Sequence, residues 1–283
     1  MNLNELVMSL EVGLIYGIIA MGIYLTFRVI DFPDLTCDGS FVLGSAVSSM
    51  LIKAGYPSCF ALFIAFLAGS LAGLLTGFLN TQLKITDLLS GILVAFMLYS
   101  INLHIMNGVP NIALFNMVTL LTNSYVPLIL GFICLIIWVM FGYLLSTDFG
   151  LAIRSIGQNK KLALKCGVRV SFVTMIGLAL SNSLIALGGA LFTQHQGFCD
   201  IGSGLGTVII GLASVMIGER LFPYRSPWIQ LLSCLLGSIL YRLFINFALH
   251  SDVFGLETQD LNLITGLMVI IVMVFPRKQR CLI

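Results

Sequence analysis

The polar residues that could do chemistry in this chain lie in two short stretches. The stretch 147–171 carries five Lys and Arg residues against a single acid, and the stretch 31–38 carries Asp31, Asp34 and Asp38. A group of bases can bind an acidic partner surface or anionic lipid, and acids beside apolar runs are costly unless they have a function. Neither stretch has the residue pattern of a nucleophile with its base, of paired catalytic carboxylates or of a metal site, so no enzyme is expected.

The composition decides which class of protein must position these residues. Of 283 residues, 59% are hydrophobic and 9% are charged, and the mean hydropathy is +1.06. A soluble domain carries about 25% charged residues, so this chain cannot cover a water-facing surface. The apolar runs are continuous rather than alternating, which excludes a transmembrane barrel. We therefore expect an all-α polytopic membrane protein, and the net charge of +2 gives no argument for nucleic acid.

The hydropathy pattern predicts about nine transmembrane segments in one transmembrane domain that spans residues 1–283. Two of these segments have only about 14 residues, whereas a full crossing needs about 20. They are either broken helices of the kind that line transport paths, or tilted helices inside the bundle. The expected segments are 7–27, 39–52, 58–79, 88–105, 125–146, 172–192, 205–218, 228–248 and 261–275.

The two short segments share a pattern of small residues. Gly39, Gly44 and Ala46 in the first have the same spacing as Gly206, Gly211 and Ala213 in the second. The two segments cross in opposite directions in the predicted topology. This is the pattern of an inverted repeat, although a chance match in a Gly-rich chain gives the same observation.

Lys and Arg predict the orientation, because they concentrate in cytoplasmic loops. The stretch 147–171 is expected to be a cytoplasmic loop, and counting outward from it places 12 of the 14 basic residues on the same side. The exceptions are Lys53, in an outside loop, and Arg242, inside a span. The N-terminus is therefore expected outside and the C-terminus inside.

The loop 147–171 also predicts a short amphipathic helix. Asn159 can cap a helix that begins after it, and Gly167 suits the end of that helix. Leu162 and Leu164 alternate with Lys160, Lys161 and Lys165. Such a helix can dock a cytosolic partner, or it can only anchor the topology and touch anionic lipid.

Several single polar residues have two interpretations each. Asp38 is placed to cap the first short helix or to take part in transport, and Asn182 can bridge packed helices or face the path. Arg242 is expected to snorkel toward the membrane surface, with contact to a carboxylate substrate as the alternative. The remaining groups are Gln194, His195 and Gln196 at an outer helix end, and Glu219 and Arg220 at an inner one.

Longer motifs carry a family resemblance. The order Gly150-x-x-x-Arg154-x-x-Gly157-Gln158-Asn159, then Ala163 and Gly167-Val168, resembles the coupling loop of permease subunits in ABC importers of the branched-chain amino acid type. The stretches 177–198 and 204–219 are similar to the helices that follow that loop. The run Asp31-Phe32-Pro33-Asp34-Leu35-Thr36-Cys37-Asp38-Gly39-Ser40 is closer to a subgroup tied to aromatic or other amino acid uptake, with Pro33 and Cys37 as departures.

The resemblance implies an architecture and a set of partners. Two copies of the permease would pair around a central path as a homodimer in the bacterial cytoplasmic (inner) membrane, in contact with lipid. Each copy would dock an ATP-binding subunit, which holds ATP and Mg, and an extracytoplasmic solute-binding protein would deliver a small polar solute. No cofactor is expected on this chain, which lacks a G-x-x-x-x-G-K-[ST] phosphate-binding run.

The resemblance also implies site residues. The docking loop would comprise Gly150, Arg154, Gly157, Gln158, Asn159, Ala163 and Gly167. The translocation path would comprise Phe32, Asp34, Asp38, Gly39, Ser40, Gly44, Asn182, Gly206, Thr207 and Gly211. The main alternative is a secondary transporter driven by an ion gradient, and a membrane scaffold without transport activity is the second alternative.

Overall fold

The structure is a computed structural model that describes residues 3–115, 117–122, 125–222, 226–249 and 261–274. In these ranges the chain is almost entirely helical, which confirms the all-α prediction. The elements are α1 (Leu3–Tyr24), the π-helix η1 (Leu25–Ile30), α2 (Thr36–Lys53), α3 (Ser58–Thr81), α4 (Asp87–Ile105), β1 (Asn111–Ala113), α5 (Val126–Ser146), α6 (Asp148–Gln158), α7 (Lys160–Lys165), α8 (Val170–Gln196), β2 (Phe198–Asp200), the 3-10 helix η2 (Ile201–Gly204), α9 (Thr207–Leu221), α10 (Pro227–Leu249) and α11 (Leu261–Val274).

The described helices confirm a multi-pass membrane protein. Seven of them are long and apolar enough to cross a bilayer. The predicted segment 205–218 belongs to one of these, Ile201–Leu221, whereas α2 and α11 lie outside this set. The count of nine segments therefore stays a prediction.

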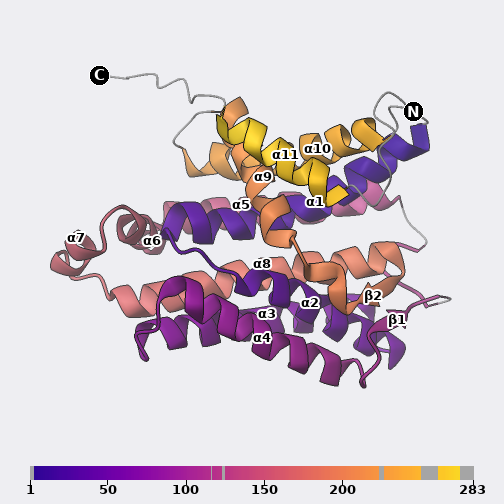
Figure 1. Ribbon diagram of the computed structural model, residues 1–283, viewed down its shortest axis with the longest axis horizontal. Helices are drawn as coiled ribbons and strands as arrows, with labels where there is room; N and C mark the ends of the chain where they lie inside the picture. Colours follow the sequence, from indigo (N-terminus) through magenta and orange to yellow (C-terminus); the bar gives the residue numbers. More distant parts are fainter. Residues whose placement is uncertain (1–2, 116, 123–124, 223–225, 250–260, 275–283) are drawn as a thin grey trace.

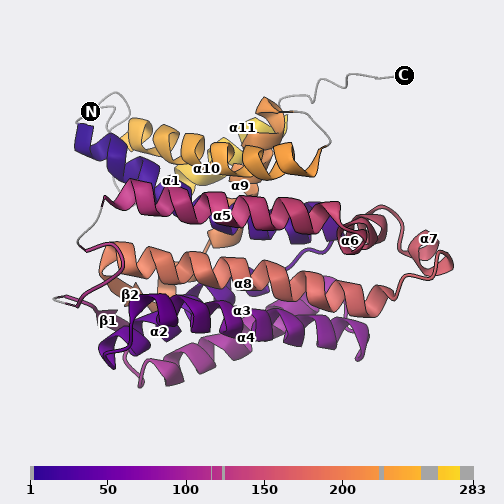
Figure 2. The ribbon, with the colours of Figure 1, turned by 180° about the vertical axis from the view of Figure 1, so that it is seen from behind.

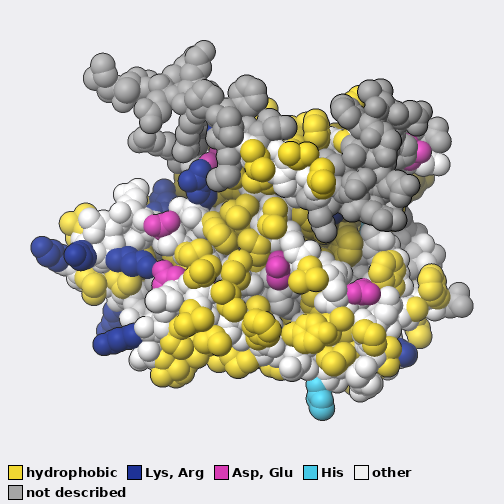
Figure 3. Space-filling model, in the orientation of Figure 1, with side chains coloured by type: hydrophobic (Ala, Val, Ile, Leu, Met, Phe, Trp, Pro, Cys, Tyr) yellow, Lys and Arg dark blue, Asp and Glu magenta, His cyan; other side chains and the backbone are white. Residues whose placement is uncertain are grey.

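The two ends of the bundle differ in what they carry. Helices α6 and α7 project at one end, while β1 and β2 pair antiparallel at the other, where α1 begins (Figure 1). Lys and Arg gather near the end that carries α6 and α7, and hydrophobic side chains cover much of the middle in this view (Figure 3). This distribution fits a membrane crossing along the long axis. Which end faces the cytoplasm stays a prediction.

The bundle contains two similarly arranged sets of helices. In the first set, α1 to α4, helix α3 packs along α8, and in the second, α8 to α11, helix α10 packs along α1. The short helices follow the same scheme, because α2 packs on α8 and α9 packs on α1. Helix α5 belongs to neither set; seen from behind, it runs along the bundle and leads into α6 (Figure 2). This exchange relates the two sets as repeats, and the inversion of 205–218 relative to 39–52 stays a prediction.

Small residues set the distance between the long helices. A Cβ atom on Gly69 would lie 2.5 Å from the Asn182 carbonyl oxygen, and one on Gly73 would lie 2.2 Å from the Leu178 carbonyl oxygen. The backbones of α3 and α8 therefore touch at intervals of one helical turn. In lipid, no hydrophobic force drives helices together. Close van der Waals contact of this kind is therefore a main source of packing energy.

Candidate docking loop and translocation path

The loop 147–171 forms two helices with different roles. Asn159 caps α7 as expected, because its Oδ1 accepts hydrogen bonds from the backbone N–H groups of Lys161 and Leu162, each at 3.1 Å. Gly167 follows the helix end with φ of +83°, a conformation that favours glycine. The structure thus confirms the predicted short helix with its cap and its stop. Leu162 and Leu164 are each 60% exposed on its surface.

The sequence interpretation missed α6, which joins α7 to the bundle. Ile153 and Ile156 are buried, and a Cβ on Gly157 would lie 2.0 Å from the Val29 carbonyl oxygen of η1. Helix α6 therefore packs tightly on the π-helix that ends α1. The spacing of Phe149, Ile153 and Ile156 fits one helix face, and this signal could have revealed α6 from the sequence.

The expected docking residues divide between these two helices. Gly150 packs on the end of α5, where a Cβ would lie 2.4 Å from the Leu145 backbone. Arg154 is half-buried, and its Nε is enclosed without a hydrogen-bond partner. Gln158 and Asn159 are exposed, whereas Ala163 is buried. The exposed members of the set, Gln158, Asn159 and Gly167, therefore lie at the two ends of α7. Gly150 and Gly157 instead lie against the backbone of α5 and η1.

A buried polar network lies near the middle of the bundle. The side-chain amide of Asn182, at the centre of the 27-residue helix α8, donates to Asp34 Oδ2 at 2.7 Å. Asn182 Oδ1 accepts from Ser40 Oγ at 2.7 Å. Asp34 Oδ1 in turn accepts from the Thr36 backbone N–H at 2.8 Å, at the start of α2. Asn182 thus bridges α8 to the connection before α2, as the interpretation of a bridging amide predicts.

The prediction that Asp38 caps the first short helix is wrong. Helix α2 begins at Thr36, so Asp38 lies within its first turn. Its Oδ1 accepts from Thr207 Oγ1 at 2.6 Å and from the Val208 backbone N–H at 3.0 Å. Asp38 therefore caps the second short helix, α9, across the bundle. The positive ends of both helix dipoles meet at this carboxylate, which stabilises a charge that would otherwise be costly at this depth.

The remaining expected path residues are mostly in packing contacts. Phe32 is fully buried, and a Cβ on Gly44 would lie 1.9 Å from the Ala186 carbonyl oxygen. A Cβ on Gly39 would meet the side chain of Leu98, and one on Gly211 would meet the side chain of Ile23. Gly206 has φ of +88° where the chain enters α9. The assignment of these residues to a translocation path stays a prediction.

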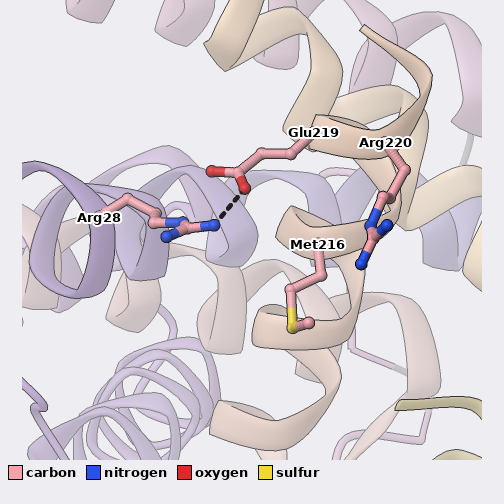
Figure 4. Close-up of a pocket in the computed structure, with 4 residues that line it drawn as sticks. All are labelled: Arg28, Met216, Glu219 and Arg220. Atoms are coloured by element: carbon pink, nitrogen blue, oxygen red, sulfur yellow. Dashed lines mark hydrogen bonds and ion pairs between the residues drawn. The ribbon is translucent and has the colours of Figure 1, made fainter. Parts of the chain in front are cut away.

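A small pocket lies where η1 approaches the end of α9. Figure 4 shows its lining residues, Arg28, Met216, Glu219 and Arg220, with the Arg28 guanidinium paired to the Glu219 carboxylate. The ion pair ties the second short helix to the π-helix, which α6 also contacts.

The opposite end of the bundle carries another polar group. Gln194 Nε2 donates to Ser48 Oγ at 3.2 Å, and His195 Nε2 lies 2.8 Å from Glu11 Oε2. Beside them, burial raises the pKa of the Cys199 thiol in β2 to about 11, so this thiol stays protonated at neutral pH. These residues hold α8 to α1 and α2 at the end where β1 and β2 pair.

Comparison with known proteins agrees with this arrangement. The family model described as "Branched-chain amino acid transport system / permease component" matches residues 6–274. A tyrosine transport system permease protein of Clostridioides difficile (strain R20291) is 38% identical over 262 residues, which cover 91% of this chain and 86% of that protein. An uncharacterized protein of Rickettsia prowazekii (strain Madrid E) is 36% identical over 95% of this chain and 96% of its own length.

More distant relatives have other named cargoes. A fructose import permease protein of Bifidobacterium longum (strain NCC 2705) is 26% identical over 86% of this chain and 74% of its own length. No solved structure matches the chain significantly. With a family model that extends over nearly all of α1 to α11, this chain belongs to the ABC transporter permease family described as the permease component of branched-chain amino acid transport systems.

Proposed function

We propose that this chain is the membrane-spanning subunit of an ATP-driven importer for an amino acid. The observation that carries the proposal is the α6–α7 unit, which presents an exposed apolar and basic helix at one end of the bundle. The family and the tyrosine transport relative support an amino acid as the solute. ATP and Mg would bind to a separate ATP-binding subunit, so this chain would not be an enzyme itself.

The surface of α7 has the chemistry of a protein contact. Leu162 and Leu164 are exposed at 60% each on a helix that also carries Lys160, Lys161 and Lys165. Exposed leucines on a short helix outside the spans gain free energy when a groove of a partner covers them. The adjacent lysines favour an acidic rim around that groove.

The structure also offers a route from this contact to the membrane. Helix α7 is joined to α6, and α6 packs on η1 through Ile153, Ile156 and Gly157. The residues after η1 lead to Asp34 and to the start of α2. Movement of α7 by an ATP-binding subunit would therefore reach the short helices by way of packed backbone, which is what alternating access in a dimer requires.

The wider assembly follows from the family. The proposed complex contains two copies of this chain, two ATP-binding subunits and an extracytoplasmic solute-binding protein, embedded in the lipid of a bacterial cytoplasmic membrane. Nucleic acid has no part in it. The orientation with the N-terminus outside and the C-terminus inside would put α6 and α7 on the cytoplasmic side.

The first experiment is affinity purification of the tagged chain from its native membranes, with mass spectrometry of what accompanies it. A stoichiometric ATP-binding subunit is the expected result. A chain that arrives alone, under conditions that preserve a known importer complex, would contradict the proposal. Uptake that survives ATP depletion but stops with an ionophore would favour the ion-driven secondary transporter instead.

A second experiment tests the docking surface directly. Leu164→Glu should remove the ATP-binding subunit from the purified complex, because it places a charge where an apolar contact forms. Leu83→Glu is the matched control, since Leu83 is similarly exposed at 57% in the turn between α3 and α4. Arg154→Glu should uncouple ATP hydrolysis from uptake, and normal uptake in that variant would contradict the role of α6.

A further inference from the structure

Helix α10 has two faces with different chemistry. On one face, Ser238 Oγ donates to the Gly13 carbonyl oxygen at 2.7 Å and Asn246 Nδ2 donates to Ser9 Oγ at 2.7 Å, so this polar stripe packs on α1. On the other face, Leu240, Leu243, Phe244 and Phe247 line a shallow apolar groove with Leu6 and Met268. Arg242 lies four residues after Ser238 and four before Asn246, which puts it on the stripe that faces α1.

The position of Arg242 contradicts the expectation that it snorkels to the membrane surface. Its guanidinium carbon lies 4.2 Å from the centroid of the Tyr16 ring, and its Nε is buried without a hydrogen-bond partner. Tyr16 is itself buried in the bundle. In the part of the chain that the structure describes, no carboxylate forms an ion pair with Arg242. A cation inside an apolar helix, with tyrosine as its partner and no carboxylate, is costly unless an anion visits it.

The Tyr16 ring that contacts this cation belongs to a cluster of three aromatic rings. Tyr16 meets Phe192 of α8 edge to face at 5.8 Å between centroids, and Phe41 of α2 lies 5.5 Å from Phe192. The rings come from α1, α2 and α8, the helices that meet at the centre of the two repeats. Such a cluster offers flat apolar faces next to a positive charge.

A carboxylate lies on the helix that carries the other aromatic partner of Tyr16. Asp38 lies three residues before Phe41 on α2, and the Phe41 ring stacks on Tyr16 at 6.4 Å between centroids. Asp38 uses Oδ1 for the Thr207 and Val208 contacts, whereas Oδ2 has only a long 3.4 Å contact from the Gly206 backbone N–H. Oδ2 therefore has capacity for another donor.

We propose that Arg242 and Asp38 form a binding site for a zwitterionic α-amino acid on its way through the membrane. Arg242 binds the α-carboxylate, Asp38 binds the α-ammonium, and the rings of Tyr16, Phe41 and Phe192 accept an aromatic side chain. The guanidinium fork suits a carboxylate in a two-point contact. The inference rests on the proposed importer function and names its substrate class. In this conformation the Tyr16 ring covers the Arg242 guanidinium, so the bundle must open for the substrate to enter.

The test uses the complete importer in proteoliposomes, with its binding protein, ATP and L-tyrosine as the probe. Arg242→Gln and Asp38→Asn should each lower the uptake rate about tenfold or more, because each removes one charged contact. Asn caps helices about as well as Asp, so Asp38→Asn separates the charge from the cap. Each variant is first shown to co-purify with the ATP-binding subunit.

A cysteine in place of Arg242 tests whether this position is wet and positive. The variant Arg242→Cys is made in a background with Cys59→Ser, Cys166→Ser and Cys281→Ser, and its uptake should be slow. Reaction with aminoethyl methanethiosulfonate, which restores a positive charge, should recover the uptake rate. The anionic sulfonatoethyl reagent should react without rescue, and L-tyrosine should slow both reactions. Phe244→Cys, on the apolar face of α10, is the control that should stay unlabelled.

The outcomes separate this site from the proposed function. If the wild-type complex shows no ATP-dependent uptake of L-tyrosine or any other amino acid, the proposed function itself fails. If the wild-type complex transports and Arg242→Gln or Asp38→Asn transports at the same rate, the site is overturned. Should Arg242→Gln fail to assemble, the Asp38→Asn rate decides. Absence of labelling at Arg242→Cys in every condition would also refute the site.

Discussion

The two short helices, α2 and α9, occupy corresponding places in the bundle but are held differently. Helix α2 touches the long helix of the other repeat through backbone, since a Cβ on Gly44 would lie 1.9 Å from the Ala186 carbonyl oxygen. Helix α9 makes its closest backbone contacts within its own repeat, where Gly218 meets the Ser233 carbonyl oxygen of α10. At Gly211 of α9, the nearest atom of α1 is the Cδ1 end of the Ile23 side chain rather than backbone.

The polar contacts show the same difference. Asp34, Asn182 and Ser40 bind the start of α2 to the middle of α8. Helix α9 is bound to the first repeat at its two ends, by Asp38 at the start and by Arg28 near the finish. Leu205 and Ile209, at the start of α9, are 82% and 51% exposed. Helix α2 is therefore joined to α8 through backbone contact, whereas α9 is joined to the first repeat through side chains.

The largest effect should come from a single methyl group at the α2–α8 contact. Gly44→Ala should destabilise the protein by about 3 kcal/mol, because the methyl overlaps carbonyl backbone that cannot move aside. Gly211→Ala is the matched change on α9, where the Cδ1 end of Ile23 can rotate away, and it should cost about 1 kcal/mol or less. Denaturant unfolding of the two purified variants in detergent measures both. Equal losses would mean that α2 and α9 are held alike.

The second effect concerns the polar bond between α2 and α8. Asn182→Ala should cost about 2 kcal/mol, because Asp34 loses one of its donors while it stays buried. Adding Asp34→Asn to Asn182→Ala should recover part of this loss, because no buried carboxylate is then left short of donors. The measurement is the melting temperature of the single and double variants. A double variant less stable than the sum of the single changes would count against this network.

A smaller effect is expected at the start of α9. Thr207→Val removes the hydroxyl donor to Asp38 but leaves the Val208 backbone N–H in place. The expected cost is about 1 kcal/mol, measured by the same unfolding experiment. Thr76→Val, which removes the hydroxyl bonded to Thr36 at the start of α2, is the corresponding change in the first repeat. If Thr207→Val cost much more than Thr76→Val, helix α9 would be held more strongly than α2, contrary to the comparison above.

The smallest effect on stability should come from the ion pair at the other end of α9. Arg28→Gln should change the free energy of unfolding by about 0.5 kcal/mol, since the Arg28 side chain is 44% exposed and solvent screens the pair. The difference from wild type should shrink further in 1 M salt. Melting temperatures in low and high salt test this. A large, salt-independent loss would show that the pair is a structural lock rather than a weak tether.

Local signals in the sequence predicted the helical elements of this chain and the details of α7. The long apolar runs appear as α1, α3, α4, α5, α8 and α10, and Asn159 and Gly167 mark the limits of α7 as expected. These features depend on residues close together in the chain, such as a cap and the N–H groups two and three positions later. The helix α6 could also have been found, because Phe149, Ile153 and Ile156 follow the helical period.

The sequence did not predict the partners of the polar groups inside the bundle. Asp38 lies in the first turn of α2, so a local reading gave it to that helix, yet its partners Thr207 and Val208 are about 170 residues away in the chain. Arg242 likewise was expected to reach the membrane surface, whereas the packing of α10 on α1 turns it to Tyr16. No spacing in the sequence encodes contacts of this kind.

The sequence by itself therefore determined that the chain crosses a membrane as helices, and where α7 begins and ends. The segments 39–52 and 205–218 are longer in the structure than expected, as α2 with 18 residues and as the 21-residue span Ile201–Leu221. Hydropathy over about 20 residues and caps over a few residues are local quantities. Only the tertiary structure decided which helices pack on one another across the bundle and which partners Asp38 and Arg242 have. Those contacts arise because glycines let distant backbones approach. This packing then determines which groups lie close enough to bind Asp34, Asp38 and Arg242.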